Sequence, residues 1–311
     1  MQTVPARRAR RTGNQWTRHS RSAEGRASPS APKTPAEPEF QRYAHVTKQR
    51  YAALQKESTP MDKKRALVVG IANEDSIAYG CAKALKVSGH ALAITYLNEK
   101  AEKFVKPLAN ELEAEIFAPL DVSQDGQLHA LFETIQDTWG GLDTLLHSIA
   151  FCPKEDLHAR VIDTSADGFK QAMDISVHSF LRMIRLAEPM MPKGGTCMTV
   201  SFYGSEKVVE HYNVMGPVKA ALESVTRYAA AELGEKQISV HALSPGPLAT
   251  RAASGIDHFD ELLAEAAARA PTHQLATIDD VGAYAAFLAS DGARNVTGAV
   301  HLIDGGFSIV G

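Results

Sequence analysis

Residues 66–80 read ALVVGIANEDSIAYG, a short apolar run that ends in glycine and leads through polar residues into an amphipathic stretch. The apolar run is typical of a strand buried on both faces. Gly70 allows the chain to turn sharply out of this strand, and a helix that begins near Ser76 offers free N–H groups and a partial positive charge to a phosphate. Because the full G-x-G-x-x-G pattern is missing, the segment alone fits a structural turn as well as a phosphate-binding loop.

The same alternation of apolar runs and amphipathic stretches continues to the C-terminus. We predict strands over 66–70, 91–95, 114–120, 144–150, 197–202, 238–243 and 299–303. Helices are predicted near 76–88, 99–112, 124–138, 167–190, 212–233, 256–270 and 278–290. This order indicates an α/β fold, a single Rossmann-like doubly wound parallel sheet of about seven strands with helices on both faces. Ligands of such sheets bind beyond the carboxyl ends of the strands, so the residues that follow each strand are the candidates for a site.

Two of these strand ends support a dinucleotide site. Asp121, in LDVS after the third predicted strand, is placed to hold an adenine edge, and the HSIAF run of 147–151 is placed to line the nicotinamide side. After the second strand the chain reads TYLNEK, where an acidic residue would bind the ribose 2′-hydroxyl of NAD and an arginine would accept a 2′-phosphate. Leu97 and Asn98 are neither, and the next two residues are interpreted as the start of a solvated helix. NADH is favoured, and NADPH stays open.

After the fifth predicted strand, Tyr212 and Lys219 lie seven residues apart. On a helix this spacing is two turns, so we expect both side chains on one side, facing the same cleft. The ammonium group could then bind the nicotinamide ribose and lower the pKa of the phenol, while the phenol faces a substrate carbonyl. Pro217 lies between them, and proline is tolerated only in the first turn of a helix. The helix must therefore start close to Tyr212, or it kinks.

Charge and composition limit the partners and the compartment. Residues 1–60 hold 12 of the 33 basic and 4 of the 36 acidic residues, which leaves 61–311 with a net charge of −11. So acidic a domain is a poor binder of nucleic acid. The three cysteines are widely spaced in apolar runs, which favours buried thiols and a cytoplasmic location, without a metal site. No apolar run reaches the roughly 20 residues that span a bilayer, so no membrane contact is expected.

The first sixty residues differ from the rest of the chain. They are rich in Arg, Ser and Pro and show neither helical nor strand periodicity, so we predict a disordered basic N-terminal extension over 1–60 and a dinucleotide-binding catalytic domain over 61–311. An organelle transit peptide has a similar composition. A third interpretation is that translation begins at Met61, directly before the first strand.

The order of GIANEDSIAYG, TYLNEK, LDVS, HSIAF, Tyr-x6-Lys, SPGPLATRAASGI and DGGFSI resembles the enoyl-acyl-carrier-protein reductases. These enzymes are a branch of the short-chain dehydrogenase/reductase superfamily, and the resemblance covers about residues 62–311. Most of that superfamily has Tyr-x3-Lys, whereas the longer spacing is characteristic of the enoyl reductases. The resemblance implies hydride transfer to the β-carbon of a trans-2-enoyl thioester in fatty-acid biosynthesis, with an acyl-carrier protein as partner and a homotetramer formed through the helices near 167–190 and 212–233.

The resemblance also assigns roles to individual residues. It makes Tyr212 the hydrogen-bond donor to the thioester oxygen and Lys219 the anchor of the cofactor. It implies a substrate-contacting group of Cys152, Phe202, Tyr203 and Tyr212. It implies a cofactor-binding set of Gly70, Ile71, Ser76, Ile77, Leu97, Asp121, Val122, Ser148, Ile149, Ala150, Lys219, Gly246, Pro247, Leu248, Ala249, Thr250, Arg251 and Ala252. The stretch from Thr250 to Pro271 would be a mobile lid over the acyl chain.

Four positions depart from the family pattern. Phe202 stands where the family has a tyrosine, with Tyr203 next, so an auxiliary phenol is lost or displaced by one residue. Leu97 replaces a polar residue beside the adenosine ribose. Ala150 replaces a glycine beside the nicotinamide, which predicts weak binding of flat aromatic inhibitors there. Pro217 is the fourth. A ketone or enone reductase of the same superfamily and a non-catalytic dinucleotide sensor are the alternative functions.

Overall fold

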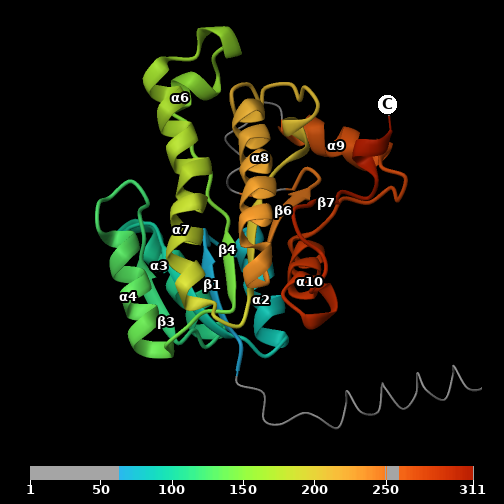
Figure 1. Ribbon diagram of the computed structural model, residues 1–311. Helices are drawn as coiled ribbons and strands as arrows, with labels where there is room; N and C mark the ends of the chain where they lie inside the picture. Colours follow the sequence, from blue (N-terminus) through green and yellow to red (C-terminus); the bar gives the residue numbers. More distant parts are fainter. Residues whose placement is uncertain (1–62, 249, 251–258, 311) are drawn as a thin grey trace, which may run out of the picture. The chain divides into compact units, whose positions relative to one another are not determined.

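The computed structural model describes residues 63–248, 250 and 259–310 (Figure 1). Outside the described residues lie the predicted extension over 1–60 and the cofactor candidates Ala249, Arg251 and Ala252. Residues 251–258 of the expected lid lie outside them as well. The division of the chain at residue 60 therefore stays a prediction.

Seven parallel strands form one sheet in the order β3-β2-β1-β4-β5-β6-β7. They are β1 (Arg65–Val69), β2 (Ala91–Tyr96), β3 (Ile116–Pro119), β4 (Thr144–His147), β5 (Gly195–Val200), β6 (Ile238–Pro245) and β7 (Val300–Ile303). The doubly wound fold expected from the sequence is confirmed, with strand ends shifted by a few residues. The chain changes direction across the sheet between β1 and β4, and such a switch point opens a crevice at the carboxyl ends of the strands.

Helices cover both faces of the sheet (Figure 1). One face packs against α4 (Gln127–Trp139), α7 (Ser179–Ala187) and α8 (Met215–Leu233), and the other against α2 (Ile77–Val87), α3 (Glu99–Glu111) and α10 (Ile278–Leu288). Side chains fix the starts of α3 and α10, because Asn98 accepts from the N–H groups of Lys100 and Ala101, and Thr277 forms a capping box with Asp280. Apolar side chains between the layers form two large core clusters, one on each face.

The helix predicted over 167–190 is divided in the structure. It consists of α6 (Ala166–Met173), a π-helical turn at Asp174–His178, α7, and a 3₁₀ turn at Glu188–Met190. The short helix α5 (Lys154–Leu157) was not predicted, and α9 (Phe259–Arg269) occupies the later part of the expected lid. In the part of the chain that the structure describes, no helix is both long and apolar enough to cross a membrane.

Helices α2 and α10 approach each other at two glycines. A Cβ atom on Gly80 would lie 2.2 Å from the carbonyl oxygen of Ile278, and one on Gly282 would lie 2.3 Å from that of Gly80. Gly80 therefore serves helix packing rather than the phosphate turn.

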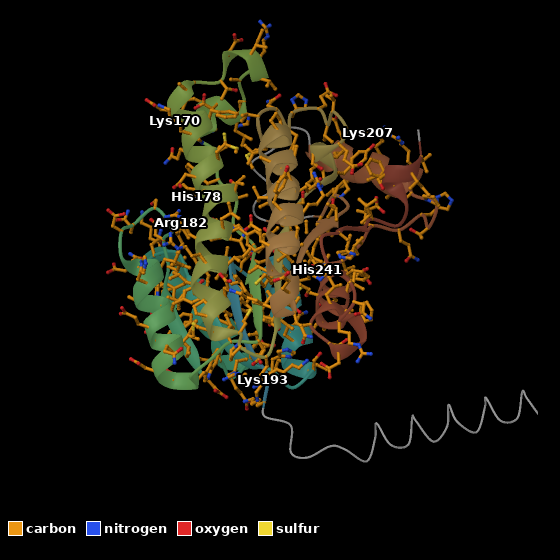
Figure 2. The ribbon with its side chains drawn as sticks, in the orientation of Figure 1. Lys170, His178, Arg182, Lys193, Lys207 and His241 are labelled. Atoms are coloured by element: carbon orange, nitrogen blue, oxygen red, sulfur yellow. The ribbon has the colours of Figure 1, made fainter. Side chains whose placement is uncertain are left out.

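The carboxyl ends of the strands lie at the end of the sheet that Figure 2 marks with Lys170 and Lys207, whereas Lys193 lies at the opposite end.

Candidate active site

Two adjoining cavities lie at the carboxyl ends of β1, β4, β5 and β6. The larger has a volume of about 610 Å³ and the smaller of about 330 Å³. Their shared wall consists of Ile77, Ser148, Ile149, Ala150, Phe151 and Thr250. The crevice expected at the switch point is therefore present, and it is divided into a larger and a smaller part.

Gly70 closes the strand side of the larger cavity. Its φ angle is +108°, which residues other than glycine rarely adopt. A Cβ atom at this position would lie 2.0 Å from the carbonyl oxygen of Ser148. The neighbouring Ile71 also lines the larger cavity. Glycine is thus required at position 70 both for the turn and for the close approach of β1 to the segment after β4.

The loop after Gly70 is held by Ser76. Its hydroxyl oxygen accepts from the backbone N–H groups of Ala72 and Asn73 and donates to the Asn73 side chain. Although Ser76 is the N-cap residue of α2, its side chain makes no cap hydrogen bond to the helix within this described segment. Because Ser76 and Ile77 line the larger cavity, the positive end of the α2 dipole lies there, where an anion can bind.

The far end of the larger cavity is lined by Leu97, Asp121 and Val122. Asp121 accepts from the backbone N–H and the hydroxyl of Ser123, at 2.9 and 2.6 Å, so its carboxylate stabilises the turn after β3. Leu97 is 55% exposed, and Asn98 beside it is committed to capping α3. This end offers neither a carboxylate nor a guanidinium group directly after β2, as the sequence indicated.

Tyr212 and Lys219 both line the smaller cavity, but the helical relationship expected between them is wrong. Helix α8 begins only at Met215, and Tyr212 lies in the turn before it, between His211 and Asn213, which have positive φ angles of 62° and 44°. Pro217 falls in the first turn of α8, where the missing N–H group costs nothing, so the helix is not kinked. The turn, rather than a shared helical face, brings the phenol toward the lysine.

The Tyr212 side chain is only 9% exposed, and its ring packs edge-on against Phe202 with the centroids 4.9 Å apart. Burial, and then the charge of Glu223, raise the pKa of this phenol above its ordinary value of 10.0. The expectation that Lys219 lowers this pKa is wrong for the chain as described, because loss of water around the phenol outweighs any help from the ammonium. Tyr212 is therefore firmly protonated at neutral pH.

Lys219 is 5% exposed, and its Nζ donates to the carbonyl oxygen of Val200 at 2.7 Å. Burial lowers the pKa of Lys219 to about 8, and the nearby charge of Glu223 opposes this shift. The ammonium group is thus held at the end of β5, on the floor of the smaller cavity.

Of the substrate-side candidates, Cys152 and Phe202 line the smaller cavity and Tyr203 does not. Tyr203 turns away and packs edge-on against Phe307, with ring centroids 5.7 Å apart, in a small cluster near the C-terminus. Of the two outcomes expected for the auxiliary phenol, lost or displaced by one residue, the described residues therefore support loss, because consecutive residues after β5 point in different directions. Burial, and then Asp156, raise the pKa of Cys152 to about 11, so this residue is a thiol.

The remaining candidates around the smaller cavity lie where they were expected. Gly246, Pro247, Leu248 and Thr250 line it after β6. Five further lining residues were not identified from the sequence, namely Leu157, Val200, Ser201, Met215 and Pro245. The available signal was weak, since Leu157 belongs to a four-residue helix and Met215 was assigned to a helix predicted to begin at 212.

His147, at the end of β4, is a fully buried residue with both ring nitrogens satisfied. Nδ1 lies 2.9 Å from the Thr199 hydroxyl and Nε2 lies 2.8 Å from that of Ser179. Burial, and then the charge of Lys219, lower the pKa of His147 to about 3. These contacts make His147 a structural residue of the core.

This pKa predicts an acid-labile fold. Unfolded His147 takes up a proton near pH 6.5 and the folded form only near pH 3, so its contribution to stability is complete above 6.5 and is lost as pH falls. Between pH 6 and 4 the free energy of unfolding should fall by about 1.4 kcal/mol per pH unit from this residue. Denaturant unfolding of His147→Gln, which cannot titrate, should show a slope shallower by that amount. Parallel slopes for the two proteins would exclude this role.

Three features of this fold together define a dinucleotide-dependent oxidoreductase. They are the glycine turn at the end of β1, the helix start that is suited to an anion, and the buried Tyr212 and Lys219 side chains in the adjoining cavity. A family model for enoyl-(acyl carrier protein) reductase matches residues 70–308. The chain is 43% identical to an NADH enoyl-[acyl-carrier-protein] reductase of Rhizobium meliloti over 251 residues, 81% of this chain and 92% of that protein. It is 45% identical to the corresponding Aquifex aeolicus protein, over 81% of this chain and 93% of the relative.

Solved structures agree with these sequence relatives. The enoyl-(acyl-carrier-protein) reductase of Anaplasma phagocytophilum in complex with NAD superposes with a TM-score of 0.77 at 43% identity, covering 81% of this chain and 96% of that one. The Bacillus cereus enoyl-acyl carrier protein reductase, with NADP+ and an indole naphthyridinone, superposes with a TM-score of 0.78 at 42% identity, covering 80% of this chain and 97% of that one. The chain belongs to the enoyl-(acyl carrier protein) reductase family.

Proposed function

We propose that this protein reduces the double bond of trans-2-enoyl thioesters carried by an acyl-carrier protein, with NADH as the reductant. The observation that carries this proposal is that Tyr212 and Lys219 both line the smaller cavity. This cavity shares a wall with the larger one, which Gly70 lines. The relatives named above are NADH enoyl-[acyl-carrier-protein] reductases. The seven-residue spacing of the pair is the one on which the resemblance to this family rests.

The residues around the larger cavity fit a dinucleotide. The turn at Gly70 leaves no room for a side chain, and the first turn of α2 is free to bind a pyrophosphate. On this proposal Gly70, Ile71, Ser76 and Ile77 hold the phosphates, Leu97, Asp121 and Val122 the adenosine, Ser148, Ile149 and Ala150 the nicotinamide, and Gly246, Pro247, Leu248 and Thr250 the carboxamide side. Ala249, Arg251 and Ala252, outside the described residues, belong to the last group by the same family resemblance.

When bound, the cofactor would supply a hydride to the β-carbon of the substrate, and the α-carbon of the enolate so formed would take up a proton from solvent to complete the reduction. Tyr212 donates a hydrogen bond to the thioester oxygen, where negative charge develops, and its raised pKa keeps the proton on the phenol until then. Lys219 holds the ribose hydroxyls from the floor of the smaller cavity. Leu157, Phe202 and Met215 contribute apolar walls that exclude water from the reacting atoms and suit an acyl chain beside Cys152.

Cofactor choice rests on the residues after β2. Leu97 offers no charge to a 2′-phosphate, and the side chain of Asn98 is used by α3, which supports NADH as the preferred cofactor. NADPH stays the alternative, since the Bacillus cereus relative was solved with NADP+.

A turnover assay tests the reaction, the cofactor and the N-terminal extension together. The full chain and Met61–Gly311 are each supplied with NADH or NADPH and a series of enoyl thioesters of increasing length, and loss of reduced-cofactor absorbance is followed. We expect turnover of enoyl thioesters, faster with NADH, by both forms. Turnover of ketones alone would indicate the ketone-reductase alternative, and cofactor binding without any turnover would indicate a sensor.

Three wider expectations belong to the same proposal. Residues 1–60 are proposed to be a basic extension outside the catalytic domain. A homotetramer formed through the helices of 167–190 and 212–233 is supported by large apolar side chains exposed there, Phe169 at 43% and Tyr228 at 72%. A cytoplasmic location is supported by the three free cysteines, Cys81, Cys152 and Cys197.

A further inference from the structure

A buried carboxylate on α8 lies beside the proposed active site and has no part in the chemistry described so far. Glu223 is 5% exposed and lies one turn after Lys219. One of its oxygens, Oε1, accepts hydrogen bonds from the hydroxyls of Ser201 and Ser205, at 2.5 and 2.6 Å. A charge so far from water is stable only when it is paired and hydrogen-bonded, so these contacts call for a role.

The two serines lie at the ends of the segment 201–205 that forms the wall behind Tyr212. Within it, the Phe202 ring packs edge-on against the phenol, and a Cβ atom on Gly204 would lie 2.6 Å from Cδ1 of Tyr212. By binding both ends of the segment, Glu223 ties this wall to α8. The position of the phenol relative to Lys219 therefore depends on a residue that is not among the described residues lining the cavity.

Charge gives Glu223 a second effect at the same place. The titratable groups that interact electrostatically with the Lys219 ammonium are Glu223 on its own helix and His147 from β4, and Tyr212 lines the same cavity. His147 and Tyr212 are neutral at pH 7, so Glu223 is the counter-charge among these groups. A carboxylate one turn away favours the protonated lysine, whereas burial disfavours it.

We propose that Glu223 is a positioning residue of the reductase, which clamps the 201–205 wall against Tyr212 and provides the counter-charge of Lys219 from one turn further along α8. This inference rests on the proposed roles of Tyr212 and Lys219. It adds that one carboxylate couples the two residues. The hydrogen bonds of Glu223 set the position of Tyr212, and its charge affects the protonation of Lys219.

Three variants separate these two contributions. Glu223→Gln keeps the shape and an acceptor oxygen but removes the charge. Glu223→Asp keeps the charge but is one methylene shorter and cannot reach both hydroxyls. Ser205→Ala removes one hydrogen bond and leaves the carboxylate in place.

The charge is tested first in the cofactor-free full chain, by NMR titration of isotope-labelled lysine side chains, with the Lys219 signal assigned by its loss in Lys219→Met. In Glu223→Gln the titration midpoint of Lys219 should move down by about one pH unit, and the alkaline limit of NADH binding should move with it. In Glu223→Asp and Ser205→Ala the midpoint should stay within a few tenths of a unit of the wild-type value.

The clamp is tested by turnover. In Ser205→Ala and Glu223→Asp, kcat should fall about tenfold or more because the phenol is misplaced, while KM for NADH stays near the wild-type value. An unchanged Lys219 midpoint in Glu223→Gln, or wild-type kcat in Ser205→Ala and Glu223→Asp, overturns the corresponding half of the proposal. If Glu223→Gln does not fold, the variants Ser201→Ala and Ser205→Ala still test the clamp. Because the NMR titration needs no enzymatic activity, failure of the proposed reaction is seen separately.

Discussion

Replacement of Tyr212 by phenylalanine is expected to lower kcat for enoyl thioesters by about 10²- to 10⁴-fold, the usual contribution of a positioned proton donor. The ring fills the same space, so its packing against Phe202 and the fold should persist. NADH affinity, measured by fluorescence titration, should change little, because the phenol contacts the substrate rather than the cofactor phosphates.

Tyr203→Phe is the matched control for this change. It removes the same group from the same type of side chain nine residues earlier, but Tyr203 packs on Phe307 and is not among the described residues that line either cavity. Its kcat should stay within about twofold of the wild-type value, as for most substitutions away from a site. If Tyr212→Phe retained wild-type turnover, the proposed role of the phenol would be wrong and the sensor alternative would gain support.

Replacement of Gly70 by alanine is expected to abolish NADH binding and to lower the free energy of unfolding by about 3 kcal/mol or more. The added methyl group would lie 2.0 Å from the carbonyl oxygen of Ser148, a backbone atom that cannot move without separating β1 from the segment after β4. The residue would also be held at a φ of +108°. Calorimetry of NADH binding and denaturant unfolding measure the two effects.

Gly89→Ala isolates the part of this effect that comes from backbone strain alone. Gly89 has a similar φ of +88°, but a Cβ atom there would meet nothing within 4 Å. Its variant should lose only about 1–2 kcal/mol and bind NADH normally. Equal losses in the two variants would show that the close approach to Ser148 does not govern the site.

The sheet and its layers could be predicted from the sequence because each strand is a short run apolar on both faces and each helix shows one apolar stripe. These are local properties of the chain, and they led to all seven strands within a few residues of their observed ends. The same holds for the residues that follow β1, β3, β4 and β6, since every parallel strand delivers its next residues to one edge of the sheet. Gly70, Asp121 and Ile149 were therefore found without any knowledge of contacts.

What the sequence could not reveal depends on directions set by packing. The spacing of Tyr212 and Lys219 was correctly associated with one cleft, but the turn with positive φ angles at His211 and Asn213, not a helix, places the phenol there. Tyr203 and Glu223 show the same limit, since one turns away to Phe307 and the other reaches back to Ser201 and Ser205. Periodicity determines which face of an element is buried, whereas the partner that a buried polar side chain meets, and the pKa that results, are decided only when distant segments pack together.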